Sequence, residues 1–253
     1  MATYAVGDLH GQYDTFAAGL EKIGFQDSDQ LYVIGDAIDR GDDGIKILQY
    51  IKKHKNMDLI LGNHEFMMLN SVDPEGKKKC NGRDSDLWLY YNEGRKTFEK
   101  YGLLSVKSRL SLLSWLKERY VIKTITVEDK AFCLTHSYFK QGLENKKYSE
   151  MSYGDVWNIV WTSMYREDWE THGYNVYGDY DYTFITGHVS VLKVMRWFQY
   201  KDDFNELRIF TKGNFIDIDG GCALGYREGL NNGALFLRLE DLKVYTVPLV
   251  GEK

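Results

Sequence analysis

The segments GDLHG at residues 7–11, GDAIDRG at 35–41 and GNHE at 62–65 decide what this chain can be. Each comes directly after a short apolar run of the kind that forms a buried strand. The three runs are residues 4–6, 31–34 and 59–61. Each segment opens with a glycine, which lets the backbone turn sharply and approach a ligand closely. The pattern therefore predicts three strands that each end in a polar loop.

Two amphipathic stretches separate these strands. Apolar side chains recur at helical spacing over residues 12–23 and again over residues 43–53. Alternation of strand and helix predicts a parallel sheet. His136 and His188 each follow a later predicted strand in the same way. Because the carboxyl ends of strands converge on the ligand crevice of an α/β sheet, we expect these polar side chains to share one rim.

The rest of the chain predicts helices first and strands afterwards. Residues 84–118 look helical throughout, and we expect this helical insertion to pack its aromatic side chains into a core. Later strands are expected at 121–127, 130–135, 183–186, 206–210, 215–218, 233–238 and 243–248. No long linker or internal repeat interrupts the pattern. We therefore predict a single α/β domain over residues 1–253, with two sheets and helices outside them.

Composition excludes several classes of protein. The 253 residues are enough for a full hydrophobic core. The net charge of -5 is unlike that of nucleic-acid-binding proteins, which carry an excess of basic residues. Cys80, Cys133 and Cys222 show no metal or disulfide spacing, so we expect free thiols in a reducing compartment. The first residues do not resemble a signal peptide, and no run of 18 apolar residues occurs. We expect a cytoplasmic protein without nucleic-acid or membrane partners.

The side chains predicted on the rim suit divalent metal ions. The candidate ligands are Asp8, His10, Asp36, Asn63, His136 and His188. Mixed oxygen and nitrogen ligands suit Mn, Fe or Zn, whereas Mg prefers mainly oxygen. A carboxylate can bridge two such ions, which together lower the pKa of a shared water. Taken singly, Asp8 and Asn63 could be helix caps and His136 a structural histidine. Five predicted strands each end in a polar segment with Asp, Asn or His, and this repetition favours metal binding over the separate structural roles.

These segments resemble the signature blocks of the phosphoprotein phosphatases, which belong to the calcineurin-like metallophosphoesterases. His136, the Gly-His pair at 187–188 and residues 218–222 are also similar, so the resemblance spans residues 4–238. It implies a central β-sandwich of two mixed sheets flanked by helices. It also implies two divalent ions, with Mn²⁺ favoured and Fe or Zn as alternatives. The implied reaction is direct in-line attack on phosphorus by a metal-bridging hydroxide, with no phosphoenzyme.

The resemblance further implies how the metal ligands divide. Asp8 and His10 would hold one ion, while Asn63, His136 and His188 would hold the other. Asp36 would bridge the two ions.

The resemblance also implies which residues other than the metal ligands take part in catalysis. His64 would be the general acid that protonates the leaving alkoxide, worth about 10²–10⁴ in rate. Asp39 would orient His64 and stabilise its charge. Arg40 would grip phosphate oxygens with its guanidinium, and Asn63 would contact the same phosphate.

The resemblance also implies a second arginine that binds the phosphate. The compact bacterial and phage-type phosphatases, which the chain resembles at residues 136–138, usually carry that arginine just after a tryptophan. Here Trp161 is followed by Arg166 five residues later, so Arg166 is the candidate and a surface role is the alternative. The tyrosine-rich stretch at residues 174–182 favours a packed surface loop, with a border of the cleft as the alternative.

Two enzymatic functions and one non-enzymatic function fit the residues. A serine/threonine protein phosphatase, acting on a phosphorylated protein or a small phosphate ester, is favoured by Asp39 and Glu65. The alternative is a symmetrical bis(5'-nucleosyl)-tetraphosphatase. Those hydrolases typically have Ala where this chain has Asp39 and Asp where it has Glu65, which is why these two residues favour the phosphatase. Residues 164–169 favour that alternative. A non-catalytic binding module would have lost a ligand or His64, and every expected position is filled.

Overall fold

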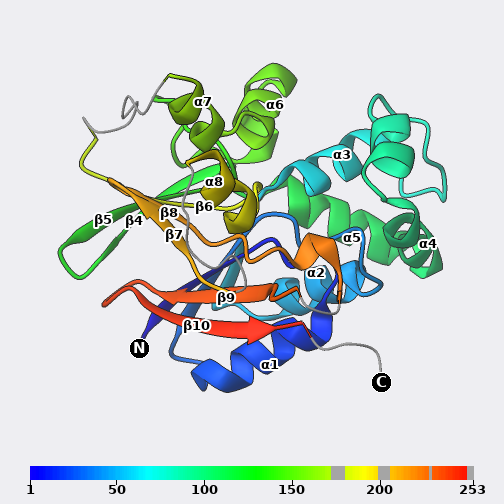
Figure 1. Cartoon of the computed structure of the whole chain (residues 1–253). Coiled ribbons are helices and arrows are strands. Elements are labelled where there is room, and N and C mark those ends of the chain that lie inside the picture. The colour runs from blue at the N-terminus through cyan, green and yellow to red at the C-terminus, as the bar shows by residue number, and fades with distance from the viewer. Residues whose placement is uncertain (172–179, 199–205, 228–229, 250–253) are drawn as a thin grey trace.

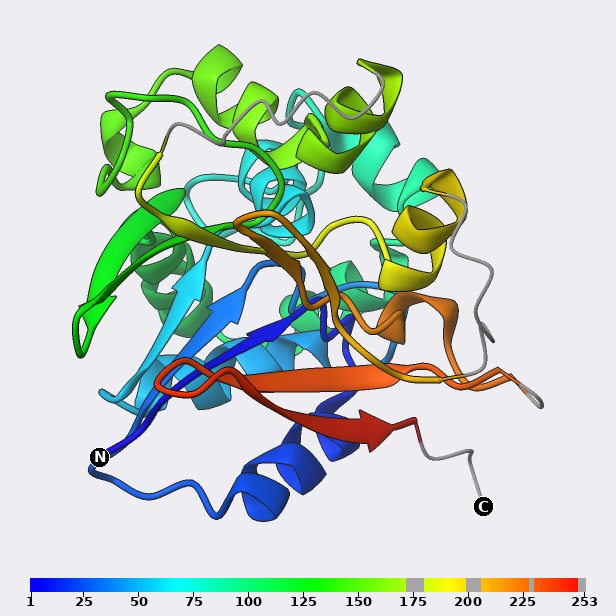
Figure 2. The ribbon, with the colours of Figure 1, turned by 60° about the vertical axis from the view of Figure 1, so that its left-hand side comes forward.

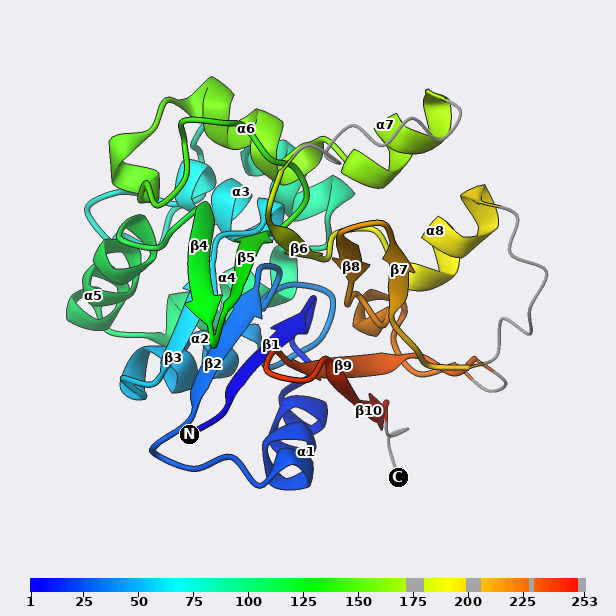
Figure 3. The ribbon, with the colours of Figure 1, turned by 90° about the vertical axis from the view of Figure 1, so that its left-hand side faces the viewer.

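Two five-stranded sheets form the centre of the computed structural model, which describes residues 1–171, 180–198, 206–227 and 230–249. Both sheets mix parallel and antiparallel strands, and helices flank them, as predicted from the sequence (Figure 1). Figure 3 shows the sheets as two layers, with β4 to β8 above β1, β2, β3, β9 and β10.

The first sheet has the strand order β10-β9-β1-β2-β3. Its strands are β1 (Thr3–Gly7), β2 (Gln30–Ile34), β3 (Met57–Ile60), β9 (Gly233–Arg238) and β10 (Lys243–Pro248). β1, β2 and β3 are parallel, whereas β9 runs antiparallel to β1 and β10 antiparallel to β9. The parallel half brings the ends of β1, β2 and β3 to one edge, where the three polar segments begin.

The second sheet has the order β4-β5-β6-β8-β7. Its strands are β4 (Ile122–Val127), β5 (Lys130–Thr135), β6 (Thr183–Thr186), β7 (Phe210–Lys212) and β8 (Phe215–Asp217). β5, β6 and β8 are parallel, and β4 and β7 are antiparallel edge strands. The strand predicted at 206–210 is wrong in position. β7 instead begins at Phe210, because the turn at Gly213 and Asn214 pairs Phe210 with Asp217 of β8.

Two hydrophobic cores hold these layers. Successive side chains of a strand point to opposite faces. Ala5 therefore belongs to the core between the sheets, together with Leu134 of β5 and Ile185 of β6. Its neighbour Val6 belongs to a second core, which contains Phe16 of the first helix. Burial on both faces fixes the register of β1, since a slip of one residue would exchange the two faces.

The helices lie outside the two sheets (Figures 1 and 2). They are α1 (Tyr13–Ile23), α2 (Gly44–Lys53), α3 (Asn63–Ser71), η1 (Leu87–Tyr91), α4 (Arg95–Leu103), α5 (Val106–Lys117), η2 (Tyr148–Glu150), α6 (Tyr153–Trp161), α7 (Met164–Glu170), α8 (Val191–Trp197) and η3 (Cys222–Leu224). In the described part of the chain, none of them has both the length and the apolar character that a membrane crossing requires.

Two helical features differ from the prediction. The stretch at 84–118 is broken near Asn92 and again at Leu104, and its first piece, η1, is a π-helix. The prediction of mainly strands after residue 120 also missed α6, α7 and α8. These helices have only seven to nine residues, which is too short to establish a clear helical period in the sequence.

Candidate metal centre and active site

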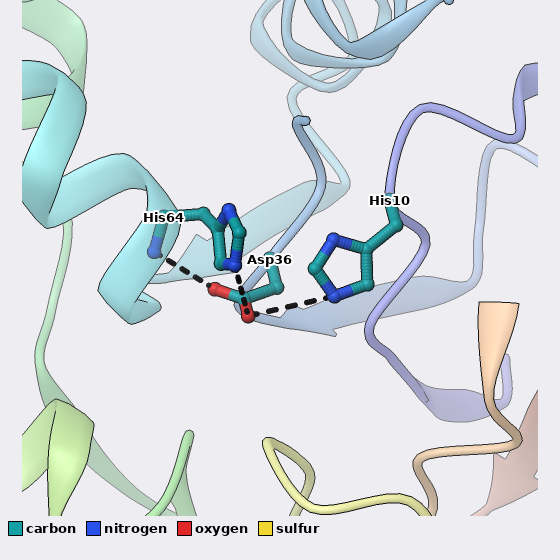
Figure 4. A group of neighbouring side chains, drawn as sticks. All are labelled: His10, Asp36 and His64. Carbon is teal, nitrogen blue, oxygen red and sulfur yellow. Dashed lines mark hydrogen bonds and ion pairs between the residues drawn. The ribbon is translucent and has the colours of Figure 1, made fainter. Parts of the chain in front are cut away.

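The candidate ligands converge where strands of both sheets end. Asp8 and His10 follow β1, Asp36 follows β2, Asn63 begins α3, His136 follows β5 and His188 follows β6. All of them are buried except His188, which is partly exposed. Figure 4 shows the carboxylate of Asp36 between the rings of His10 and His64. Residues from distant parts of the sequence thus form one polar centre inside an apolar framework.

Asp36 belongs to two groups of potential metal ligands. In one group it lies with His10 and His64, and in the other with His136 and His188; within each group the ligand atoms are within 4.8 Å of one another. Its Oδ2 lies 3.7 Å from Nε2 of His10 and 3.4 Å from Nε2 of His136. Only a residue shared between both groups could bridge two ions, so the position of Asp36 fits the bridging role.

His10 and His136 both turn Nε2 toward this carboxylate. Nδ1 of His10 lies 3.1 Å from the Ile38 carbonyl and Nδ1 of His136 lies 2.9 Å from the Ile34 carbonyl. A carbonyl can only accept, so each Nδ1 carries the proton and each Nε2 is free to bind a metal. Burial keeps the His10 ring neutral, so a lone pair on its Nε2 faces the carboxylate at 3.7 Å, which is unfavourable without a cation between them. The donor set therefore fits a metal.

The pKa values of these histidines have identifiable causes. Burial, followed by the nearby His64, holds the pKa of His10 well below its usual range. Burial, followed by His136, lowers the pKa of His188 to about 3. Both rings are therefore neutral, as metal ligands must be. Burial also opposes charge on His136, but the carboxylate of Asp36 outweighs it and raises the pKa of that ring.

Asn63 and Asp8 complete the centre in different ways. The Asn63 side-chain amide lies 2.9 Å from Nε2 of His136 and 3.1 Å from Nδ1 of His188. With its nitrogen inward, this amide donates to Asp36 and to the two rings, and with its oxygen inward it offers one more ligand atom to a cation. The carboxylate of Asp8 accepts the backbone N–H of His188 at 3.1 Å. Asp8 belongs to neither of the two groups of ligand atoms.

Asp219 is a buried neighbour of the centre that is not among the ligands predicted from the sequence. It is 3% exposed and follows β8, as the other site residues follow their strands. Burial, followed by the charges of Asp219 and Asp36, raises the pKa of Asp8 well above its usual range. A buried cluster of carboxylates is costly without a cation, so this cluster also fits a metal. Asp219 lies within residues 218–222, which resemble the family, and it follows its strand within two residues, as Asp8 and Asp36 do; this position could have identified it.

The backbone is strained at the same place. Among the described residues, the non-glycine residues with positive φ include Asp8, His10, Asp36, Asp39, Arg40 and His188. Such conformations cost roughly 1–3 kcal/mol each and persist where the surrounding structure enforces them. Close packing contributes, since a Cβ on Gly187 would collide with the Asp8 carboxylate. The clustering of strain at the polar centre supports a functional site.

His64 and Asp39 form a buried pair beside this centre. Nδ1 of His64 lies 2.6 Å from Oδ2 of Asp39, and Nε2 of His64 lies 3.8 Å from Oδ2 of Asp36. Burial alone would lower the pKa of His64, but the charges of Asp36 and Asp39 raise it above its usual value. His64 can therefore carry a proton on the nitrogen that faces the centre.

Arg40 lies next to this pair. Its charge is near enough to lower the pKa of both His10 and His64. Nε of Arg40 is buried and has no hydrogen-bond partner among the described residues. A buried donor without a partner is uncommon in folded proteins, and an oxyanion at the centre would satisfy it.

Glu65 ties two of the polar loops together. Its Oε2 accepts the backbone N–H of Asp36 at 2.9 Å and of Gly62 at 3.2 Å, and its Oε1 accepts that of Ala37 at 2.8 Å. Glu65 is fully buried, so no water can replace these bonds. This side chain therefore sets the distance between the loop that carries Asp36 and the helix that begins at Asn63.

We expect Glu65→Ala to destabilise the protein by about 3 kcal/mol or more, because three buried N–H groups lose their acceptor at roughly 1–3 kcal/mol each. Urea unfolding of the wild type and the variant measures the difference. Glu65→Gln keeps one accepting oxygen and should lose less. A loss below about 1 kcal/mol in Glu65→Ala would show that the two loops are held together in another way.

Arg166 lies at the edge of the site rather than within it. It is on α7, its side chain is 65% exposed, and its Nε donates to Glu170 at 2.8 Å. It lines an open cleft of about 480 Å³ that His188 also lines, together with Trp161, Lys193 and Trp197. The cleft connects Arg166 to the metal centre, so both interpretations of Arg166 from the sequence stay open.

The tyrosine-rich stretch predicted at 174–182 falls largely outside the described residues, which resume at Tyr180. Tyr180 and Tyr182 both pack against Phe139, with ring centroids 5.1 Å and 6.4 Å away. For these two tyrosines the structure agrees with packing at the surface.

We expect Arg166→Ala to raise KM for small phosphate esters several-fold while kcat changes little, if the guanidinium swings from Glu170 to a bound phosphate. Steady-state kinetics measure both constants. Arg238→Ala is the matched control, because Arg238 also pairs with a neighbouring carboxylate, that of Asp241, on a distant strand. Equal and negligible effects of the two substitutions would assign Arg166 to the surface.

Comparison with known proteins agrees with this geometry. Residues 1–218 match the family described as calcineurin-like phosphoesterases. The symmetrical bis(5'-nucleosyl)-tetraphosphatase of Pasteurella multocida is 32% identical over 139 residues, which are 54% of this chain and 44% of that protein. The corresponding enzyme of Neisseria meningitidis is 36% identical over 101 residues, or 39% of this chain and 36% of that one. The matches therefore span less than half the length of these curated relatives.

Solved structures are similar over nearly the whole chain. A serine/threonine phosphatase from Saccharomyces cerevisiae superimposes with a TM-score of 0.60 at 14% identity, covering 100% of this chain and 81% of that one. A cold-active protein-tyrosine phosphatase of a Shewanella species gives 0.55 at 17% identity, covering 97% and 80%. At these identities the likeness concerns the fold alone.

Proposed function

Because this chain belongs to the calcineurin-like phosphoesterases, we propose that it is a metal-dependent phosphomonoester hydrolase that acts as a serine/threonine protein phosphatase. The observation that carries this proposal is the buried pair of His64 and Asp39, joined at 2.6 Å. An alkoxide released from serine or threonine is strongly basic and needs a proton as it leaves. A general acid that is held and charged by a carboxylate provides that proton.

The proton would pass from Nε2 of His64 to the leaving oxygen. Nδ1 stays bonded to Asp39, which holds the ring and stabilises its charged form before transfer. The backbone N–H of His64 also donates to Oδ1 of Asp36 at 3.1 Å, which fixes the start of α3 against the metal centre. His64 is thus held on two sides, while its Nε2 faces the space above Asp36.

Arg40 would bind the transferred phosphate. Its Nε is the buried donor that lacks a partner among the described residues, and a guanidinium matches the geometry of two phosphate oxygens. Asn63 would contact the same phosphate. Arg166 would reach in from the cleft.

Two divalent ions complete the proposal. His10, Asp36 and Asp8 would hold one of them, and Asp36, Asn63, His136 and His188 would hold the other. When bound, such ions supply Lewis-acid activation of a water and of phosphate oxygens. Mn²⁺ is favoured, with Fe or Zn as alternatives, since the donors mix imidazole nitrogen with carboxylate oxygen.

A second candidate function is the symmetrical hydrolysis of a dinucleoside tetraphosphate. The names of the sequence relatives favour it. So does the cleft beside His188, because Trp161 and Trp197 offer aromatic surfaces for a base and Lys193 and Arg166 offer positive charge for a phosphate chain. Against it, a nucleotide is a much weaker base than an alkoxide, so this reaction needs the His64–Asp39 pair less.

One assay separates the two functions. Purified protein with Mn²⁺ is given a phosphoserine peptide, a phosphotyrosine peptide and diadenosine tetraphosphate, and kcat/KM is measured for each. We expect the highest value with phosphoserine. A value at least tenfold higher with diadenosine tetraphosphate would replace the proposal by the second function.

A further inference from the structure

The carboxylate of Asp39 accepts a second hydrogen bond that the acid–base pair does not account for. Nε1 of Trp88 donates to Oδ2 of Asp39 at 2.7 Å, and this is the same oxygen that lies 2.6 Å from Nδ1 of His64. Trp88 and Asp39 are both fully buried. Trp88 lies in η1, the π-helix of the helical stretch after α3, 49 residues beyond Asp39. The sequence pattern predicts core packing for the aromatic side chains of that stretch.

The indole is held so that its edge reaches Asp39. Its ring packs edge-on against Phe98, with the ring centroids 6.3 Å apart. A Cβ on Gly94 would lie 2.5 Å from Nε1 of Trp88, so only glycine at this position lets the indole take its place. The loop after η1 therefore leaves room for the N–H of Trp88 to point at the carboxylate.

The same stretch also holds the backbone of Asp39. The N–H of Asp39 donates to Oγ1 of Thr97 on α4 at 3.0 Å, and Thr97 is buried. Asp39 has a φ of 71°, a conformation that a non-glycine residue rarely adopts without support from its surroundings. Trp88 thus holds the carboxylate of Asp39 by a hydrogen bond, and Thr97 holds its backbone.

Orientation of the carboxylate depends on these contacts. The χ2 torsion of an aspartate has a broad energy profile, so hydrogen bonds must fix the plane of its carboxylate. Oδ1 of Asp39 has no hydrogen-bond partner among the described residues, which leaves His64 and Trp88 as the groups that fix it. Without Trp88 the carboxylate could turn together with the imidazole and misdirect Nε2.

We propose that Trp88 is a positioning residue, which holds Asp39 so that His64 delivers its proton to the leaving group. The inference rests on the proposed function, because it requires His64 to be the general acid. The helical stretch at 84–118 then has a role in catalysis as well as in packing.

The test uses two substrates that differ in the basicity of the leaving group. Phenyl phosphate needs a general acid more than p-nitrophenyl phosphate does. Trp88→Phe keeps the bulk of the ring and removes only the N–H. We expect kcat for phenyl phosphate to fall roughly tenfold, as for other residues that orient a reacting group, while kcat for p-nitrophenyl phosphate falls much less and the metal content stays unchanged.

Two controls make the test specific. Trp115→Phe changes a tryptophan of α5 in the same helical stretch and should leave both rates unchanged. In the Asp39→Asn background, Trp88→Phe should have no further effect, because Trp88 acts through Asp39. If Trp88→Phe does not fold, Gly94→Ala replaces it in the test. The added methyl group would push the indole away from Asp39, so we expect the same selective loss with phenyl phosphate.

An equal loss with both substrates, or an additive loss in the double variant, would overturn the inference and leave Trp88 as a packing residue. The behaviour of His64→Asn separates this failure from that of the proposed function. If His64→Asn discriminates between the two substrates and Trp88→Phe does not, only the inference fails. If His64→Asn itself does not discriminate, the general acid is wrong and the inference fails with it.

Discussion

We expect His64→Asn to lower kcat for a phosphoserine peptide by about 10²–10⁴, and we expect the variant to keep the same metal content as the wild type. The substitution removes a ring that faces the centre with one nitrogen and pairs with the Asp39 carboxylate through the other. The pair is buried, and an asparagine at position 64 has no group that can donate a proton to the leaving oxygen as an imidazolium does. The backbone N–H of residue 64, which donates to Asp36, is retained in the variant.

Metal analysis of the same variant decides between two roles of His64. Its Nε2 belongs to the group of ligand atoms with His10 and Asp36, so His64 could instead be a ligand. Loss of one ion per chain would assign it that role. An unchanged kcat together with unchanged metal content would remove His64 from the mechanism altogether. His54→Asn, at the end of α2, is the matched control and should change neither quantity.

Asp36→Asn should lower metal content and activity together, with kcat/KM falling by more than about a hundredfold. Asp36 is the residue common to both groups of ligand atoms. Burial opposes its charge, but His136 and His64 hold its pKa well below the usual range, so the carboxylate is ionised. An amide has the same shape without the charge, and its nitrogen cannot bind a cation. Elemental analysis after dialysis measures the metal content.

The control for Asp36→Asn is a second buried aspartate. Asp84 is 6% exposed and accepts a hydrogen bond from Tyr153 at 2.9 Å, outside either group of ligand atoms. Asp84→Asn should keep both ions and the full rate. If Asp36→Asn also retained two ions per chain, the assignment of Asp36 as the bridge would be wrong.

The convergence of most candidate ligands could be predicted because its signals are local in the sequence. Each ligand follows an apolar strand within a few residues, and parallel strands place those ends together whatever the rest of the chain does. Asp36 and His136 could therefore be assigned to one rim although they are far apart in the sequence. The two-sheet fold follows from the same strands, and the structure confirms it.

The contacts that support the centre could not be predicted in this way. Trp88 lies in a helical stretch where an aromatic side chain normally means core packing, and nothing near it in the sequence indicates a bond to Asp39. The room that Gly94 leaves for the indole exists only in the folded chain. The role of Arg166 could not be decided from its spacing to Trp161, which leaves a phosphate ligand and a surface residue both open, and the structure pairs it with Glu170 at the edge of the cleft.

An anomalous difference map of crystals grown with Mn²⁺ tests the central claim most directly. Two peaks per chain are expected, one against His10 and Asp36 and the other against Asp36, Asn63, His136 and His188. A single peak, or two peaks that do not share Asp36, would contradict the two-metal centre.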